Sequence, residues 1–183
     1  MNRLLWASRG GKQITHLKKL CLFSILCLLA TVSLYPPDAA AKASADLVVV
    51  KKSERKLHLM KNGKVMKSYS IVLGAHPKGH KFQKGDERTP EGRYILDYKN
   101  AHSAFYKSIH ISYPNRADRE RARKAHVDPG GAIMIHGQKN GLEWLSFISQ
   151  HFDWTDGCIA VTNDDMDEIW DAVEVGTPIE IRP

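Results

Sequence analysis

The segment KLHLMKNGKVMKSYSIVL, residues 56–73, places the dipeptide Asn62-Gly63 between an alternating run and a second strand-like run. Asn-Gly is a preferred centre for a type I′ turn, because both positions of that turn require a positive φ angle. The segment therefore predicts a β-hairpin. Further strands are expected, on either side of it, at residues 46–51, 93–98, 107–113, 132–136, 158–162 and 177–183.

A long loop and three predicted helices separate these runs. Residues 74–93 are rich in Gly, Pro and charged side chains, which is typical of a loop. Residues 116–125 predict a polar, exposed helix, and residues 141–152 predict a short one. Because strands predominate and no repeat or second domain is evident, we expect a mainly β fold. The expected architecture is a β-sandwich or open barrel of mixed sheets with a few short helices.

The clearest helix is predicted between residues 163 and 176. Asn163 is a candidate N-cap and Gly176 a candidate end of the helix. Apolar side chains recur between them at i, i+3, i+4 and i+7, so one stripe is expected to be buried. The members of this stripe are Met166, Ile169, Trp170 and Val173.

The first 41 residues differ in composition from the rest of the chain. Residues 1–19 carry five Lys and Arg side chains and no acid, and an apolar run follows at residues 20–35. That run is shorter than the roughly 20 residues that span a membrane. Ala-x-Ala sites end at Ala41 and Ala45. This order is typical of a secretory signal peptide, so we expect residues 1–41 to direct export to the periplasm or cell envelope. The alternative is an uncleaved membrane tether.

The net charge of +7 is concentrated in the same N-terminal region. Residues 1–45 hold six Lys and Arg side chains but one acid, Asp38. Aromatic residues make up 8% of the chain and are not interleaved with basic ones, so the sequence does not favour nucleic-acid binding. A hydrophobic content of 43% excludes disorder as the main state. We expect residues 46–183 to fold as one monomeric domain.

Cys158 is the one cysteine outside the N-terminal 41 residues. An unpaired cysteine in an exported protein indicates a reactive thiol or an intermolecular bridge. Gly157 permits a backbone turn that would present the sulfur, and the amides of Gly157 and Cys158 are candidates to bind a developing oxyanion. The alternative is a buried cysteine at the start of a core strand.

A thiol with a pKa near its ordinary value of about 8.5 needs a base to become nucleophilic. His136 ends the apolar run AIMIH and is the candidate base among nine histidines. No Asp or Asn stands out as the group that orients its ring, which leaves a backbone carbonyl. His76 and His80 have the spacing of zinc ligands on a helix, but Pro77 and Gly79 disfavour a helix there. We therefore expect no metal and no other cofactor.

Three elements in this order resemble the L,D-transpeptidase catalytic domain family, the YkuD-type cysteine enzymes of the bacterial cell wall. The first is GDERTPEG at residues 85–92, which is similar to the family's Gly-Asp-x-x-Thr-Pro-x-Gly segment. The second is His136-Gly137, and the third is the segment 155–158, Thr-Asp-Gly-Cys. The resemblance covers about residues 46–183 and is specific because all three elements occur together.

The resemblance implies an exported enzyme of cell-wall biogenesis and cell shape that acts on peptidoglycan stem peptides. Cys158 would be the nucleophile and would form a thioester, and His136 would accept and donate the proton. An amine acceptor would then take the acyl group. The resemblance also implies a set of residues that contact the substrate, namely Gly137, Thr155, Asp156 and Thr89.

Two positions depart from the family pattern. The family usually has His where this chain has Asp156, and Arg where it has Ala160. The predicted nucleophile and base are unaffected. Three outcomes remain open: transfer to an amine, hydrolysis by a carboxypeptidase or amidase of the same fold, and a catalytically silent wall-binding module.

Overall fold

The computed structural model describes residues 44–183. The signal peptide predicted for residues 1–41 lies outside it. Within residues 44–183 no helix has both the length and the apolar character needed to cross a membrane.

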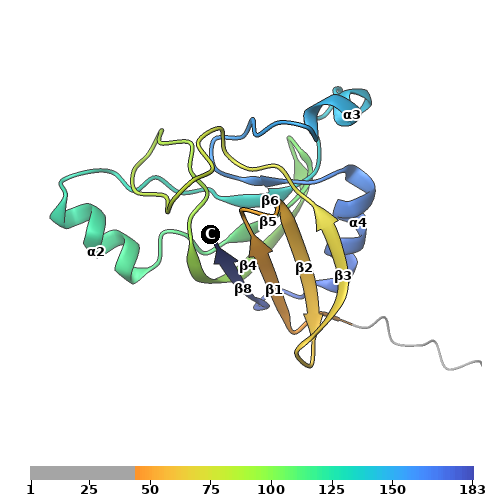
Figure 1. Cartoon of the computed structure of the whole chain (residues 1–183), viewed down its shortest axis with the longest axis horizontal. Helices are drawn as coiled ribbons and strands as arrows, with labels where there is room; N and C mark the ends of the chain where they lie inside the picture. The colour runs from red at the N-terminus through yellow and green to blue at the C-terminus, as the bar shows by residue number, and fades with distance from the viewer. Residues whose placement is uncertain (1–43) are drawn as a thin grey trace, which may run out of the picture. The chain divides into compact units, whose positions relative to one another are not determined.

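Within residues 44–183, eight strands form one mixed sheet in the order β3-β2-β1-β8-β4-β5-β6-β7 (Figure 1). The pairs β1–β8 and β6–β7 are parallel, and the other neighbours are antiparallel. The predicted mainly β fold with mixed pairing and a few short helices is confirmed. The strands are β1 (Leu47–Lys51), β2 (Lys56–Lys61), β3 (Lys64–Ser70), β4 (Gly92–Ser103), β5 (Tyr106–Ile111), β6 (Met134–His136), β7 (Ile159–Ala160) and β8 (Pro178–Arg182). The helices are α2 (Arg116–Lys124), the 3-10 helix η1 (Glu143–Leu145), α3 (Ser146–Ser149) and α4 (Asn163–Ala172).

The predicted hairpin is present as β2 and β3. Asn62 and Gly63 have φ angles of 50° and 74°, as a type I′ turn requires. The register between the strands shifts at Leu59 and Met60, where a β-bulge interrupts the ladder. The local Asn-Gly signal was therefore sufficient to locate this element.

Strand β4 connects the two halves of the sheet. Its first residues, from Gly92 to Ile95, pair with β8, whereas its later residues pair with β5. The strand has 12 residues and continues beyond the predicted range of 93–98. It can do so because a change of partner along the strand keeps its backbone groups hydrogen-bonded.

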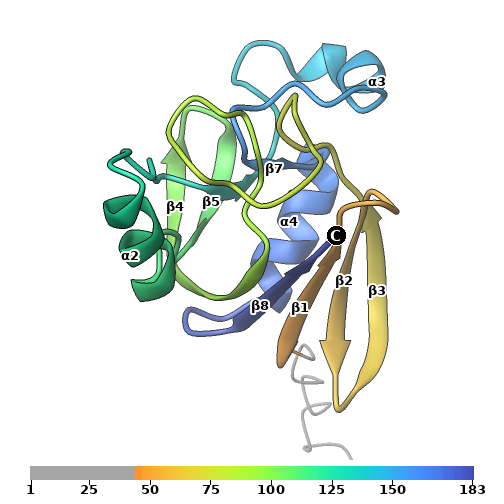
Figure 2. The ribbon, with the colours of Figure 1, turned by 60° about the vertical axis from the view of Figure 1, so that its left-hand side comes forward.

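Helix α4 packs its predicted stripe into the core. Met166, Ile169 and Val173 are completely buried, and Trp170 is partly buried against the core. Figure 2 shows the helix between β4–β5 on one side and β1–β3 on the other. The N-cap was predicted at Asn163, but the structure has it one residue earlier, at Thr162. The Thr162 hydroxyl accepts from the Asp165 amide at 3.1 Å. Asn163 is the first helical residue instead.

Candidate active site

The short strands β6 and β7 bring His136 close to Cys158. Ile135 pairs with Ile159 and His136 with Ala160. Extending this register places Cys158, one residue before β7, opposite Met134, whose amide donates to the sulfur at 3.4 Å. Met134 and His136 are two residues apart and share one face of β6. In this register His136 lies diagonally across from Cys158, two residues along β6 from Met134.

The Cys158 thiol is half-buried at the start of β7. Its Sγ accepts from the Met134 amide and donates to the carbonyl of Ala132 at 3.6 Å. Burial raises the pKa of the thiol, and the nearby Asp156 carboxylate adds to this, although the Met134 hydrogen bond and the Lys81 cation oppose it. The sulfur is consequently held as a neutral thiol at neutral pH and requires a base.

The His136 ring is buried and oriented by the backbone. Its Nδ1 lies 2.7 Å from the carbonyl oxygen of Gly137. A carbonyl can only accept, so Nδ1 carries the hydrogen and Nε2 keeps its lone pair. Burial lowers the pKa of the imidazole more than the Gly137 hydrogen bond raises it. The ring is therefore neutral at pH 7, and a backbone carbonyl orients it, as the sequence suggested.

Two aromatic rings that the sequence did not single out enclose His136. The centroid of Phe105 lies 4.7 Å from the imidazole centroid, and that of Trp154 lies 6.0 Å away in a T-shaped arrangement. Phe105 comes from the turn between β4 and β5, and Trp154 directly precedes Thr155. These apolar neighbours account for the desolvation that lowers the pKa of His136.

Thr155 holds the turn that carries Cys158. Its hydroxyl donates to the carbonyl of Cys158 at 2.8 Å and accepts from the Gly157 amide at 3.2 Å. The side chain is only 4% exposed. Thr155 therefore stabilises the turn, and its predicted contact with substrate stays a prediction. The Gly157 amide, which was predicted to bind an oxyanion, donates to Thr155 in this structure, and its role toward an oxyanion stays a prediction.

Gly157 cannot carry a side chain in this turn. Its φ angle is 118°, and an added Cβ would lie 2.5 Å from the carbonyl oxygen of Arg88. A Cβ at Gly74 would likewise lie 2.0 Å from the carbonyl oxygen of Glu87. The backbone of the 85–89 loop thus packs directly against the cysteine turn. The prediction that Gly157 permits an unusual turn is confirmed.

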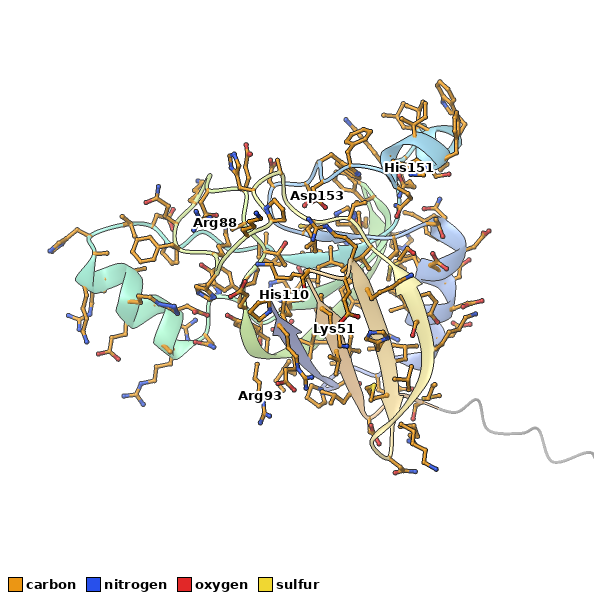
Figure 3. The ribbon with its side chains drawn as sticks, in the orientation of Figure 1. Lys51, Arg88, Arg93, His110, His151 and Asp153 are labelled. Atoms are coloured by element: carbon orange, nitrogen blue, oxygen red, sulfur yellow. The ribbon has the colours of Figure 1, made fainter. Side chains whose placement is uncertain are left out.

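The loop itself is organised around the Asp86 carboxylate. This group accepts from Lys81 Nζ at 2.8 Å and from three backbone amides, those of Phe82, Gln83 and Arg88. Burial alone would raise the pKa of Asp86, but these four donors outweigh it and the pKa falls below its ordinary value. The GDERTPEG motif therefore supplies a carboxylate that fixes the loop, which ends in the exposed Arg88 (Figure 3).

Two further residues predicted to contact substrate are buried instead. Thr89 is 0% exposed, so its side chain offers no surface to a substrate in this conformation. Gly137 is also buried, and an added Cβ would lie 2.5 Å from Asn163 Oδ1 and 3.0 Å from Tyr106 Cβ. Close packing around position 137 therefore leaves no room for a Cβ atom, which explains why the residue is glycine. Of the four predicted substrate contacts, Asp156 is the one that the structure exposes.

The two histidines considered as metal ligands have separate partners. His76 lies 3.3 Å from Glu87, and His80 lies 3.2 Å from Asp118. Among residues 44–183, no group of three or more His, Cys, Asp or Glu side chains is arranged to hold a metal ion.

The fold and sequence are similar to those of known proteins. The family model described as the L,D-transpeptidase catalytic domain, YkuD, matches residues 45–181. The L,D-transpeptidase family protein YafK of Escherichia coli K12 is 34% identical over 128 residues, which cover 67% of this chain and 44% of YafK. This chain therefore spans less than half the length of that curated relative.

Two solved structures share the fold. The helical cell shape determining protein Pgp2 of Campylobacter jejuni has 24% identity and a TM-score of 0.56, over 74% of this chain and 46% of Pgp2. An L,D-transpeptidase from Xylanimonas cellulosilytica has 16% identity and a TM-score of 0.50, over 80% of this chain and 64% of that one. Since the family model matches most of the chain, the protein belongs to the L,D-transpeptidase catalytic domain family.

Proposed function

We propose that this protein is a peptidoglycan-modifying L,D-transpeptidase in which Cys158 is the nucleophile and His136 the general base. The observation that carries the proposal is the tautomer of His136. The Gly137 carbonyl fixes the hydrogen on Nδ1, and burial keeps the ring neutral, so Nε2 is free to accept a proton. The half-buried thiol on the neighbouring strand is the candidate donor of that proton.

During acylation the His136 imidazole would carry one proton from the Cys158 thiol to the leaving amine. The Cys158 sulfur attacks the carbonyl carbon on the L side of an L,D peptide bond, while its proton passes to His136 Nε2. The carbon–sulfur bond forms and the carbon–nitrogen bond breaks. The leaving D-amino acid takes the proton from the imidazolium. A thioester and a neutral imidazole remain.

The oxyanion that forms during attack needs a hydrogen-bond donor. The Cys158 amide is the candidate, because the neighbouring Gly157 amide donates to Thr155. It belongs to the same residue as the nucleophile, so it is held next to the reacting carbon by the Thr155 turn. Backbone donors of this kind act without reorganising during the reaction.

Deacylation by an amine would reverse these steps. An acceptor amine loses a proton to His136 as its nitrogen attacks the thioester, and the sulfur leaves and is reprotonated. Hydrolysis is the second candidate, and Asp156 favours it. This exposed carboxylate is close enough to raise the pKa of the Cys158 thiol and can hold a water beside a thioester.

Peptidoglycan stem peptides lie outside the cytoplasmic membrane, so the proposal includes export to the cell envelope. The basic and apolar pattern of residues 1–35 supports it. The domain is proposed to act as a monomer, without a cofactor and without nucleic acid.

Incubation with a tetrapeptide stem and a labelled D-amino acid tests the proposal. Intact mass should show a thioester adduct on the native protein and none on Cys158→Ala. His136→Gln should slow adduct formation by about 100-fold or more. Label in the peptide product indicates a transferase, whereas unlabelled tripeptide indicates a hydrolase. An undiminished adduct on Cys158→Ala would refute the assignment of Cys158 as the nucleophile. If the native protein forms no adduct, and it and Cys158→Ala bind sacculi equally well, the domain is a catalytically silent wall-binding module.

A further inference from the structure

Helix α2 carries an excess of basic side chains on its outer surface. Its nine residues include five Arg and Lys and two acids. Asp118 and Ala122 are buried, so their side of the helix faces the domain. Arg116, Arg119 and Arg123 are exposed and recur at i, i+3 and i+7, a spacing that aligns them along one stripe of the helix. These three residues are called the arginine stripe below.

The two acids of the helix do not neutralise the arginine stripe. Asp118 forms an ion pair with Arg121 and accepts from the Tyr94 hydroxyl at 3.0 Å. The Glu120 carboxylate lies 3.4 Å from Lys124 Nζ. The three guanidinium charges of the stripe therefore remain uncompensated within the helix.

The buried side of α2 is fixed to the loop that packs against the cysteine turn. The Asp118 carboxylate lies 3.2 Å from His80 Nε2, and His80 Nδ1 accepts from the Glu91 amide at 3.0 Å. Residues 85–89, between these two loop positions, include the Arg88 carbonyl that packs on Gly157. A ligand bound to α2 is therefore held at a fixed position relative to the cysteine turn.

A cavity of about 450 Å³ adjoins two members of the stripe. Its lining includes Arg116, Arg119 and Ser112. The carboxylate in the lining, that of Asp97, lies 2.6 Å from His110 Nδ1 and is engaged by that ring. A guanidinium group binds a carboxylate through two parallel hydrogen bonds. The cavity can therefore accept an acidic group of a ligand that lies along the stripe.

Helix α4 carries the opposite charge. Its ten residues include five acids and no Lys or Arg. Figure 1 shows α2 at one end of the described domain and α4 near the other. An anionic polymer is attracted by the first helix and repelled by the second, so the field of the domain orients it toward α2.

The composition of α2 disfavours a membrane surface as the partner. A helix that lies in a membrane interface presents large apolar side chains opposite its basic ones. The apolar residues of α2 are Ala117 and Ala122, and Ala122 is buried against the domain. A row of arginines without an apolar face suits a hydrated polymer that carries carboxylates or phosphates.

We propose that the arginine stripe is a second peptidoglycan-binding surface, which binds carboxylates of stem peptides outside the active site. The choice of partner rests on the proposed function, because an enzyme that acylates stem peptides works on a polymer whose peptides end in carboxylates. Binding at α2 holds the sacculus beside the domain and raises the effective concentration of neighbouring stems around Cys158.

Co-sedimentation of the Cys158→Ala protein with purified sacculi tests the surface without turnover. The stripe variant adds Arg116→Gln, Arg119→Gln and Arg123→Gln. It should bind at least about 5-fold more weakly, because three exposed ion pairs are lost. The matched control removes the same charge from the β2–β3 hairpin and should bind as the parent does. Its changes are Lys56→Gln, Lys61→Gln and Lys64→Gln.

Two further comparisons identify the chemistry that the stripe binds. Replacing its three arginines by Lys keeps the charge and should restore most of the affinity. Sacculi whose carboxylates have been amidated should bind the parent and the stripe variant equally. Equal binding of untreated sacculi by the stripe variant and the hairpin control would overturn the proposal. Loss of binding to phosphatidylglycerol vesicles alone would also overturn it, because the partner would then be a membrane.

Kinetics with Cys158 intact separate this proposal from the proposed function. The stripe variant should keep the native kcat/KM on a free tetrapeptide and lose about 5-fold on sacculi. If the native protein forms no adduct but the stripe variant still binds sacculi more weakly than the hairpin control, the proposed function fails and the binding surface stands. If the adduct forms normally and the stripe variant binds sacculi as the parent does, the surface fails and the proposed function stands.

Discussion

Gly157 combines a backbone conformation and a close contact that no other residue type satisfies. Its φ angle of 118° disfavours L side chains, and the carbonyl of Arg88 occupies the space of a Cβ. The turn places Cys158 beside Met134, where the Met134 amide donates to its sulfur. The geometry of the nucleophile therefore depends on a residue that contributes no side chain.

Replacing Gly157 by Ala should lower the free energy of unfolding far more than replacing Gly63 by Ala in the hairpin turn. Gly63 also has a positive φ angle, but nothing lies within 4 Å of its would-be Cβ. Both variants carry the cost of a strained φ, and Gly157→Ala adds the overlap with Arg88. We expect Gly157→Ala to lose about 1–3 kcal/mol more free energy of unfolding than Gly63→Ala in chemical denaturation. Similar losses would show that the 85–89 loop moves away easily.

Residues of the site could be predicted from the sequence where a short local pattern indicates a reactive side chain. The Gly-Cys pair and the histidine at the end of an apolar run drew attention to positions 136, 157 and 158. Thr155 and Thr89 were assigned to substrate from the family resemblance, and their burial is not visible in sequence. Phe105 and Trp154 could not be found, since their contact with His136 depends on how distant segments pack.

At the scale of elements, Asp153 joins the cysteine segment to two other parts of the sheet. It belongs to the segment that connects α3 to β7, and Figure 3 labels it. Arg55 Nε, from the turn after β1, donates to both carboxylate oxygens at 3.0 and 3.1 Å, and the Leu73 amide donates at 2.8 Å. Trp154 and Thr155 follow directly, so this anchor positions the wall of His136 and the turn of Cys158.

Asp153→Ala should weaken both the fold and the reaction. It leaves the Leu73 amide without its acceptor, so we expect a loss of about 1–3 kcal/mol in the free energy of unfolding, together with slower acylation. Glu54→Ala is the matched control, because Glu54 forms an exposed ion pair with Lys51 and should lose less than about 1 kcal/mol. Denaturation of both variants measures the difference, and equal losses would contradict the anchoring role.

Elements with a local signature were predicted well. The Asn62-Gly63 turn and the apolar stripe of α4 each lie within one short segment. Strands β6 and β7 are shorter than predicted, because β6 contains only the three residues that pair with β5 and β7 only the two that pair with β6. Strand β4 is longer than predicted, because it exchanges β8 for β5 along its length.

At the scale of the whole described domain, the sheet brings distant parts of the chain together. The C-terminal strand β8 lies between β1 and β4, and β6 pairs with β7 across more than twenty residues. Composition and periodicity predicted a mixed, mainly β fold, but they carry no information on the order of the strands. The site depends on that order, since its thiol, base and aromatic walls come from three separate segments.

The pH dependence of acylation in a single turnover tests the central claim most directly. A neutral imidazole must deprotonate a neutral thiol, and burial lowers the pKa of His136 below 6.5 and raises that of Cys158 above 9.0. The rate should therefore rise with pH through a midpoint below 6.5, as His136 loses its proton, and should stay level up to about pH 9. In His136→Gln it should be about 100-fold lower and should climb steadily into the alkaline range as thiolate forms. Identical profiles for the native protein and His136→Gln would contradict the account.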